Sequence, residues 1–236
     1  MLSLVLLGLV AGLVTTVAGM GGGLFLIVAL GVARGPHAAL ALSAPALLLA
    51  NLHRAWLFRA HIDRPVATRL AAGAIPGAIL GGLLLPAIPA AVVAALLAST
   101  TVLALLRHAG KLRFDPGRVG LVVGSALVGM FAGTSGGAAI LMAPLVLAAG
   151  LHGEAYLATI AIAAIALHIG RVLAYGTVGL LTVAHVPAIA ALLVGLVVGN
   201  LLGRHVRRFV PARLEPVLEL GALVTTSLLS LLALLR

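Results

Sequence analysis

The chain has 236 residues, of which 63% are apolar and 8% are charged, and its mean hydropathy is +1.28. Its 15 basic and 5 acidic side chains are too few to cover a globule of this size in water, which excludes a soluble enzyme. The formal net charge of +10 does not indicate nucleic-acid binding, because the basic residues lie in short loops and only 3% of the residues are aromatic.

Apolar runs follow one another along the whole chain. Only helices satisfy their backbone hydrogen bonds within one segment in lipid, and the runs do not alternate as barrel strands do, so we expect an all-α polytopic membrane protein. The first run has no basic residues before it and exceeds signal-peptide length, so we expect it to stay in the membrane. The eight expected segments are 2–33, 37–58, 66–86, 89–106, 119–150, 155–175, 183–203 and 212–235.

A glycine cluster in the first run is repeated in the fifth. Ala18–Gly23 matches Ala132–Gly137, and both lie in unusually long runs. Further correspondences are Ser43 with Thr159, Phe58 with Tyr175, and Gly77–Gly82 with Gly195–Asn200. We therefore expect one transporter domain of two homologous halves, about 1–107 and 118–236. Paired glycine-interrupted segments in two halves are typical of a secondary transporter's binding site.

The chemistry expected of the two clusters is anion binding. Glycines destabilise a helix interior by about 1 kcal/mol each, so a cluster permits a break. A break exposes backbone N–H groups at the next helix N-terminus, where the helix dipole also favours an anion. Close helix packing, which small residues allow, is the alternative explanation of these glycines.

Most basic residues form three clusters, and the positive-inside rule places all three in the cytoplasm. Three segments separate the second cluster from the third, so eight plain spans would put the third outside. The conflict is removed if run 119–150, and by symmetry run 2–33, enters and leaves by one face as a hairpin. We expect inverted repeats with both termini outside; eight ordinary spans are the alternative. The clusters are Arg54, Arg59, Arg64 and Arg69; Arg107, Lys111, Arg113 and Arg118; and Arg204, Arg207, Arg208 and Arg213.

Two halves of about four segments, each opening with a long helix of the type Gly-x-Gly-Gly-Gly or Gly-x-Ser-Gly-Gly, resemble the sulfite exporter TauE/SafE family of membrane permeases. The second cluster runs on to Pro144, where the first half has Leu30. The resemblance covers nearly the whole chain. It implies a multi-pass protein of the bacterial inner membrane that transports small sulfur-containing anions such as sulfite or organosulfonates.

The expected substrate site combines backbone donors with hydroxyl, amide and imidazole groups. Its candidate residues are Gly19, Gly21, Gly22, Gly23, Gly133, Thr134, Ser135, Gly136, Gly137, Ser43, Asn51, Thr159 and His168. His168 is the candidate for proton coupling, because its protonation can change near neutral pH. Arg54 and Arg171 are intramembrane cations, for which a functional role and snorkelling to the headgroups are both open.

Two alternatives to a permease stay open. Gly133–Gly136 also matches the Gly-x-Ser-Gly of rhomboid intramembrane proteases, with Ser135 as nucleophile and His168 or His185 as its base. However, the aligned cluster of the first half has glycine in place of the serine. An anion channel is the second alternative. No cofactor, metal or catalytic residue is expected of the permease; the bilayer and a small anion are its partners, and a homodimer is considered as its assembly.

Overall fold

The computed structural model describes residues 1–17, 21–108, 117–136 and 141–211, and also 214, 217, 220, 221, 224 and 225. Helices make up nearly all of this part of the chain and it contains no strand, so the all-α prediction is confirmed. The helices are α1 (Leu2–Val17), α2 (Gly22–Arg34), α3 (Pro36–Leu57), η1 (Arg59–His61), α4 (Arg64–Leu84), η2 (Leu85–Ala87), α5 (Ala90–His108), α6 (Gly117–Ser135), α7 (Met142–Ala148), α8 (Gly153–Thr177), η4 (Val183–His185) and α9 (Val186–Arg207).

Five of these segments are long and apolar enough to cross a membrane: α3, α4 with η2, α6, α8, and η4 with α9. In contrast, α1 and α2 have 16 and 13 residues, fewer than the roughly 20 that a span needs. Large apolar side chains are exposed on the outer helices, such as Leu6 on α1 and Leu127 on α6. An apolar exterior of this kind is typical of a surface that faces lipid.

The helices break at both glycine clusters. Gly21, which precedes α2, has a φ of 93°, and Gly136, which follows α6, has a φ of 81°. These left-handed values favour glycine and cannot continue an α-helix. The predicted count of eight segments is not confirmed: the described residues hold nine α-helices, because runs 2–33 and 119–150 each give two. Run 212–235 lies mostly outside the described residues.

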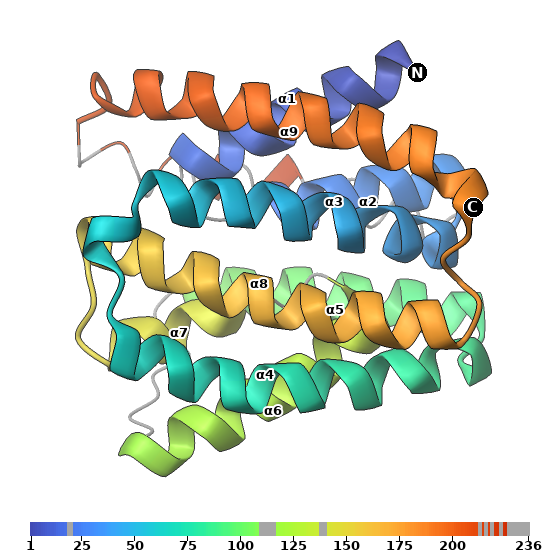
Figure 1. The fold of residues 1–236 in the computed structure, drawn as a ribbon, viewed down its shortest axis with the longest axis horizontal. Coiled ribbons are helices and arrows are strands. Elements are labelled where there is room, and N and C mark those ends of the chain that lie inside the picture. The colour runs from blue at the N-terminus through green and yellow to red at the C-terminus, as the bar shows by residue number, and fades with distance from the viewer. Residues whose placement is uncertain are drawn as a thin grey trace.

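The helices pack across the molecule in the order α1, α9, α3, α8, α4, α6 (Figure 1). The central pair, α3 and α8, is antiparallel, because Leu40 near the start of α3 contacts Arg171 near the end of α8. At the other end of this pair, the N–H of Asp63 donates to the hydroxyl of Thr159. Helices from the two expected halves of the chain therefore alternate through the centre of the bundle.

The outer pairs, α1 with α9 and α4 with α6, are parallel and are held together by glycines. Residue numbers increase in the same direction along both helices of each pair. In the first pair Gly8 faces Leu192, Gly12 faces Leu196 and Thr16 faces Gly203; in the second pair Gly73 faces Val122, Gly77 faces Ala126 and Gly81 faces Met130. A Cβ atom at most of these glycines would overlap the backbone of the partner helix. Small residues allow this approach, and close packing contributes strongly to helix association in lipid.

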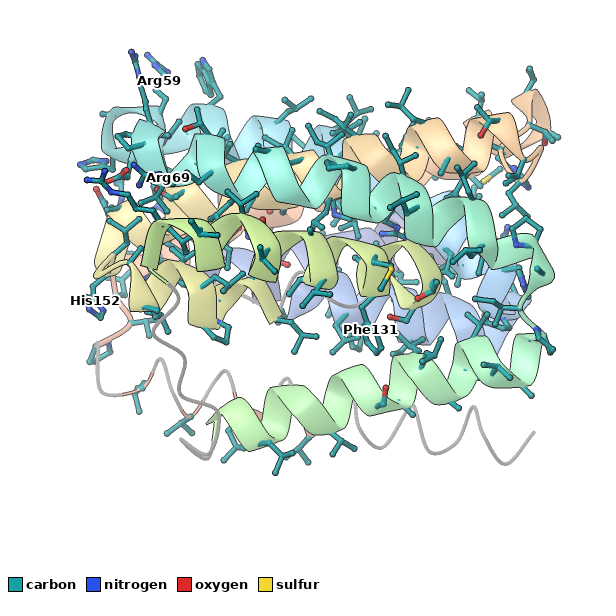
Figure 2. All side chains as sticks on the ribbon, turned by 90° about the horizontal axis from the view of Figure 1, so that it is seen from below. Arg59, Arg69, Phe131 and His152 are labelled. Atoms are coloured by element: carbon teal, nitrogen blue, oxygen red, sulfur yellow. The ribbon has the colours of Figure 1, made fainter. Side chains whose placement is uncertain are left out.

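The described members of all three basic clusters lie at one end of the bundle, which we call the basic end. Arg59, Arg204, Arg207 and Arg208 line one cavity there. Arg118 begins α6, which runs parallel to α4 and starts at the same end. Figure 2 shows Arg59, Arg69 and His152 at this end. The sequence pattern predicted that the three clusters share one side of the membrane, and this arrangement agrees with it.

The chain returns to the basic end between α6 and α8. The start of α8 lies there because Glu154 pairs with His61 of η1, with 3.1 Å between Oε2 and Nε2. Since α6 also begins at this end, α6, α7 and their connections form a hairpin. In the first half, α1 and α3 both end at the basic end, so α1 and α2 form a second hairpin from the opposite end.

Candidate functional site

A fully buried arginine joins α3 and α8. The guanidinium of Arg171 donates from Nε to Tyr175 Oη at 3.2 Å, and its Nη1 lies 3.2 Å from His168 Nδ1. Its Nη2 donates to the carbonyl of Leu40 at 3.1 Å and to Ser43 Oγ at 3.3 Å. His168, Arg171 and Tyr175 share one face of α8 because they are three and four residues apart. We call Arg171 and its four partners the Arg171 cluster; the partners are Leu40, Ser43, His168 and Tyr175.

The Arg171 cluster contacts the break between α6 and α7. Tyr175 Oη donates to the carbonyl of Gly133 at 2.6 Å. Gly136 packs against Leu40, and a Cβ atom at this position would lie 3.2 Å from Arg171 Nη2. The positive φ and the lack of space both require glycine at 136. The backbone of the break therefore lies beside a buried positive charge.

No carboxylate neutralises this charge in the part of the chain that the structure describes. The acidic residues there are Asp63 and Glu154, and both lie at the basic end. Asp63 caps the start of α4 by accepting from Val66 N at 2.9 Å, and Glu154 pairs with His61. The described residues also hold no group of three acidic or histidine side chains that could bind a metal ion.

A second arginine is buried at the other end of the α3–α8 interface. Arg54 is 4% exposed, and its Nε and Nη1 have no hydrogen-bond partner among the described residues. The interpretation of Arg54 and Arg171 as snorkelling residues is wrong, because both side chains turn into the protein between α3 and α8.

The structure brings several predicted site residues together around Arg171. His168 and Ser43 belong to the Arg171 cluster, and Gly133 and Gly136 contact it. The hydroxyls of Thr134 and Ser135 donate to the carbonyl of Phe131 in their own helix, at 2.9 and 2.8 Å. Gly137 lies outside the described residues.

Of the first-half candidates, Ser43 contacts Arg171, whereas the described glycines of the first cluster contact other residues. Gly21 caps the start of α2. Gly22 packs against Ala11 and Thr15 of α1, and Gly23 lies beside Leu47 of α3. The contacts of Gly22 therefore give it a packing role.

Two further polar candidates, Asn51 of the first half and Thr159 of the second, form hydrogen bonds with backbone groups. Asn51 Nδ2 donates to the carbonyl of Leu47 at 2.8 Å. Thr159 accepts from Asp63 N at 3.1 Å and so anchors the start of α4. Gly19 lies outside the described residues.

Sequence reasoning left Arg54, Arg171 and Tyr175 out of the predicted site. A signal was present: the same spacing of 117 residues separates Arg54 from Arg171, Phe58 from Tyr175, and Asn51 from His168. In the expected organisation of two halves, this spacing makes Arg54 the counterpart of Arg171. Apolar surroundings in the sequence could not distinguish a lipid-facing arginine from one that faces another helix.

A cavity of about 580 Å³ opens at the basic end. Five basic side chains line it with one acidic side chain: Arg59, His61, Arg204, Arg207, Arg208 and Glu154. Phe58, one helical turn beyond Arg54, also lines it. Nearby, Trp56 is 60% exposed and Arg59 lies 5.0 Å above its ring, as expected for a tryptophan at a membrane interface. A clustered positive charge of this kind attracts anions.

The family model described as sulfite exporter TauE/SafE matches residues 4–231, nearly the whole chain. Searches of curated proteins and of solved structures gave no significant match. The family consists of membrane transporters rather than enzymes, which agrees with the five candidate spans. This multi-pass chain, with its broken helices and buried arginines, belongs to the sulfite exporter TauE/SafE family.

Proposed function

We propose that this chain is a permease that moves small sulfur oxyanions, such as sulfite or an organosulfonate, across a bacterial inner membrane. The observation that carries the proposal is the Arg171 cluster: a fully buried guanidinium without a carboxylate partner among the described residues. A buried charge without a counter-ion is costly, and intramembrane ionisable residues mark ion pathways. An anionic substrate would supply the missing charge, and family membership supports anion export.

In this proposal the substrate lies between α3, α8 and the break that follows α6. The charge of Arg171 and the hydroxyl of Ser43 favour the sulfur-bound oxygens, and backbone N–H groups at the breaks add donors. His168 is the group that would couple transport to protons, because an anion bound beside it would offset the neighbouring charge of Arg171 and favour the protonated imidazole. Sulfite and larger sulfonates present similar oxygens, so the surrounding wall would decide between them.

The packing supports inverted repeats as the basis of transport. Reversing the packing order α1, α9, α3, α8, α4, α6 exchanges α1 with α6, α9 with α4, and α3 with α8. Each exchange pairs helices that correspond in the two expected halves. In our proposal one half rocks against the other, so that the buried arginines face the two sides of the membrane in turn.

The test is uptake of labelled sulfite into proteoliposomes, with taurine, sulfate and acetate as competitors, with and without a pH gradient. We expect saturable sulfite flux that competing sulfonate lowers, and at least a tenfold loss of flux in Arg171→Gln. The matched control is Arg69→Gln, which removes an arginine of the basic end outside the cluster. The absence of sulfite flux in the wild-type protein would contradict the proposal. Sulfite flux that does not saturate would indicate a channel.

The protease alternative is not favoured by the geometry. Ser135 Oγ donates to the carbonyl of Phe131, and Nδ1 of His168 interacts with Arg171 instead of with a serine. A Ser–His pair requires the two side chains to be within hydrogen-bond reach of each other. We therefore expect Ser135→Ala to retain saturable sulfite flux, whereas the variant of a serine protease would lose all activity.

A further inference from the structure

Arg54 differs from its equivalent Arg171 in one respect that bears on binding. Arg171 has partners for Nε, Nη1 and Nη2, whereas Arg54 has none for Nε and Nη1 in the described part of the chain, although it is 96% buried. A polar group that is buried without a partner lowers stability. Such a group persists in a protein when it has a function that needs it unpaired.

The missing partners of Arg54 follow from the sequence. Tyr175, which accepts from Arg171 Nε, is replaced at the equivalent position by Phe58, which has no hydroxyl. His168, beside Arg171 Nη1, is replaced by Asn51, whose amide donates to Leu47 instead. The first half therefore keeps the arginine and lacks the side chains that would occupy its donors.

The basic cavity reaches Phe58, which lies four residues after Arg54 in the sequence. Phe58 is one helical turn from Arg54 and lines the basic cavity with Arg59, Arg204 and Arg208. The carboxylate on this cavity, Glu154, pairs with His61, which leaves the lining with a net positive charge. The cavity therefore attracts anions to Phe58, one helical turn along the chain from Arg54.

We propose that Arg54 is the substrate-receiving residue on the basic side: an oxyanion that enters the basic cavity passes Phe58 and binds the free Nε and Nη1 donors. Arg171 binds no anion in this state, because its donors are occupied by the protein, and it takes over the substrate only when the halves have rocked. This inference rests on the proposed permease function and assigns its substrate, a small sulfur oxyanion, to a specific residue. Guanidinium groups suit this role because they stay charged and match oxyanion geometry.

The experiment compares Arg54→Gln, Phe58→Tyr, Arg171→Gln and the control Arg69→Gln in detergent. Each variant is melted without ligand and with increasing sodium sulfite, and sulfite flux is measured in proteoliposomes. We expect Arg54→Gln to melt at or above the wild-type temperature without ligand and to bind sulfite at least tenfold more weakly. Arg171→Gln should melt below wild type.

Phe58→Tyr keeps the inference testable if Arg54→Gln folds poorly. The added hydroxyl stands at the position that Tyr175 has beside Arg171, so it should occupy Arg54 Nε, raise the melting temperature and weaken sulfite binding. The inference is overturned if Arg54→Gln binds sulfite within threefold of wild type, or if it melts as far below wild type as Arg171→Gln. If the wild-type protein neither binds nor transports sulfite, both the proposed function and this inference are wrong. If the wild-type protein transports sulfite and Arg54→Gln transports it equally well, only this inference is wrong.

Discussion

Tyr175 is the residue whose removal tests the Arg171 cluster most directly. Its hydroxyl donates to the carbonyl of Gly133 and accepts from Nε of Arg171. Tyr175→Phe removes only this oxygen and leaves the ring in place, so it creates two unsatisfied buried groups and almost no cavity. Each such group costs about 1–3 kcal/mol, so the variant should lose about 2–6 kcal/mol of stability.

The assay is the melting temperature of the detergent-solubilised protein, followed by circular dichroism. For a chain of this size 1 kcal/mol shifts the midpoint by about 2–4 °C, so Tyr175→Phe should melt at least about 4 °C lower. Thr177→Val is the matched control, because it removes a hydroxyl of α8 that bonds to Ala174 in its own helix. A midpoint for Tyr175→Phe that equals that of Thr177→Val would refute the reasoning.

Two further predictions concern topology and packing. The chain has no cysteine, so single cysteines at Arg118 and His152 can be labelled alone; the hairpin predicts labelling from the same side of the membrane, and labelling from opposite sides would contradict it. Gly77→Ala should lower the melting temperature because its Cβ would overlap Ala126 of α6, whereas Gly31→Ala should raise stability by about 0.5–1 kcal/mol because it meets open space in a helix. Equal shifts for the two alanine variants would refute the packing argument.

The sequence was sufficient to predict the helical fold and the family, because hydropathy and paired glycine clusters report directly on membrane segments. The prediction that the basic clusters share one side of the membrane is consistent with their position at one end of the bundle, and the labelling experiment above tests it. The number of helices was not predictable from hydropathy, because a glycine break leaves an apolar run uninterrupted. Gly21 and Gly136 mark these breaks through their backbone angles, which composition does not contain.

The candidate site was predicted in part. His168 and Ser43 were identified as polar groups inside apolar runs, and both contact Arg171. Thr159 was selected by the same criterion but binds Asp63 at the basic end, because its partner depends on which helix faces it. The roles of Arg54 and Arg171 depend on the rotation of α3 and α8 against each other, and a single sequence does not encode that rotation as a visible pattern.

The parallel pairing of α1 with α9 has a consequence for biosynthesis. The partner surface for the glycine face of α1 is synthesised about 170 residues after α1 itself, which corresponds to roughly 10–30 s of translation. In contrast, α6 follows its partner α4 after a short interval. The glycine face of the first helix must therefore stay in the bilayer without its partner until the second half of the chain has been inserted. Release of a chain that stops before α9 would leave this tightly packing face exposed to lipid and to the quality-control proteases of the membrane.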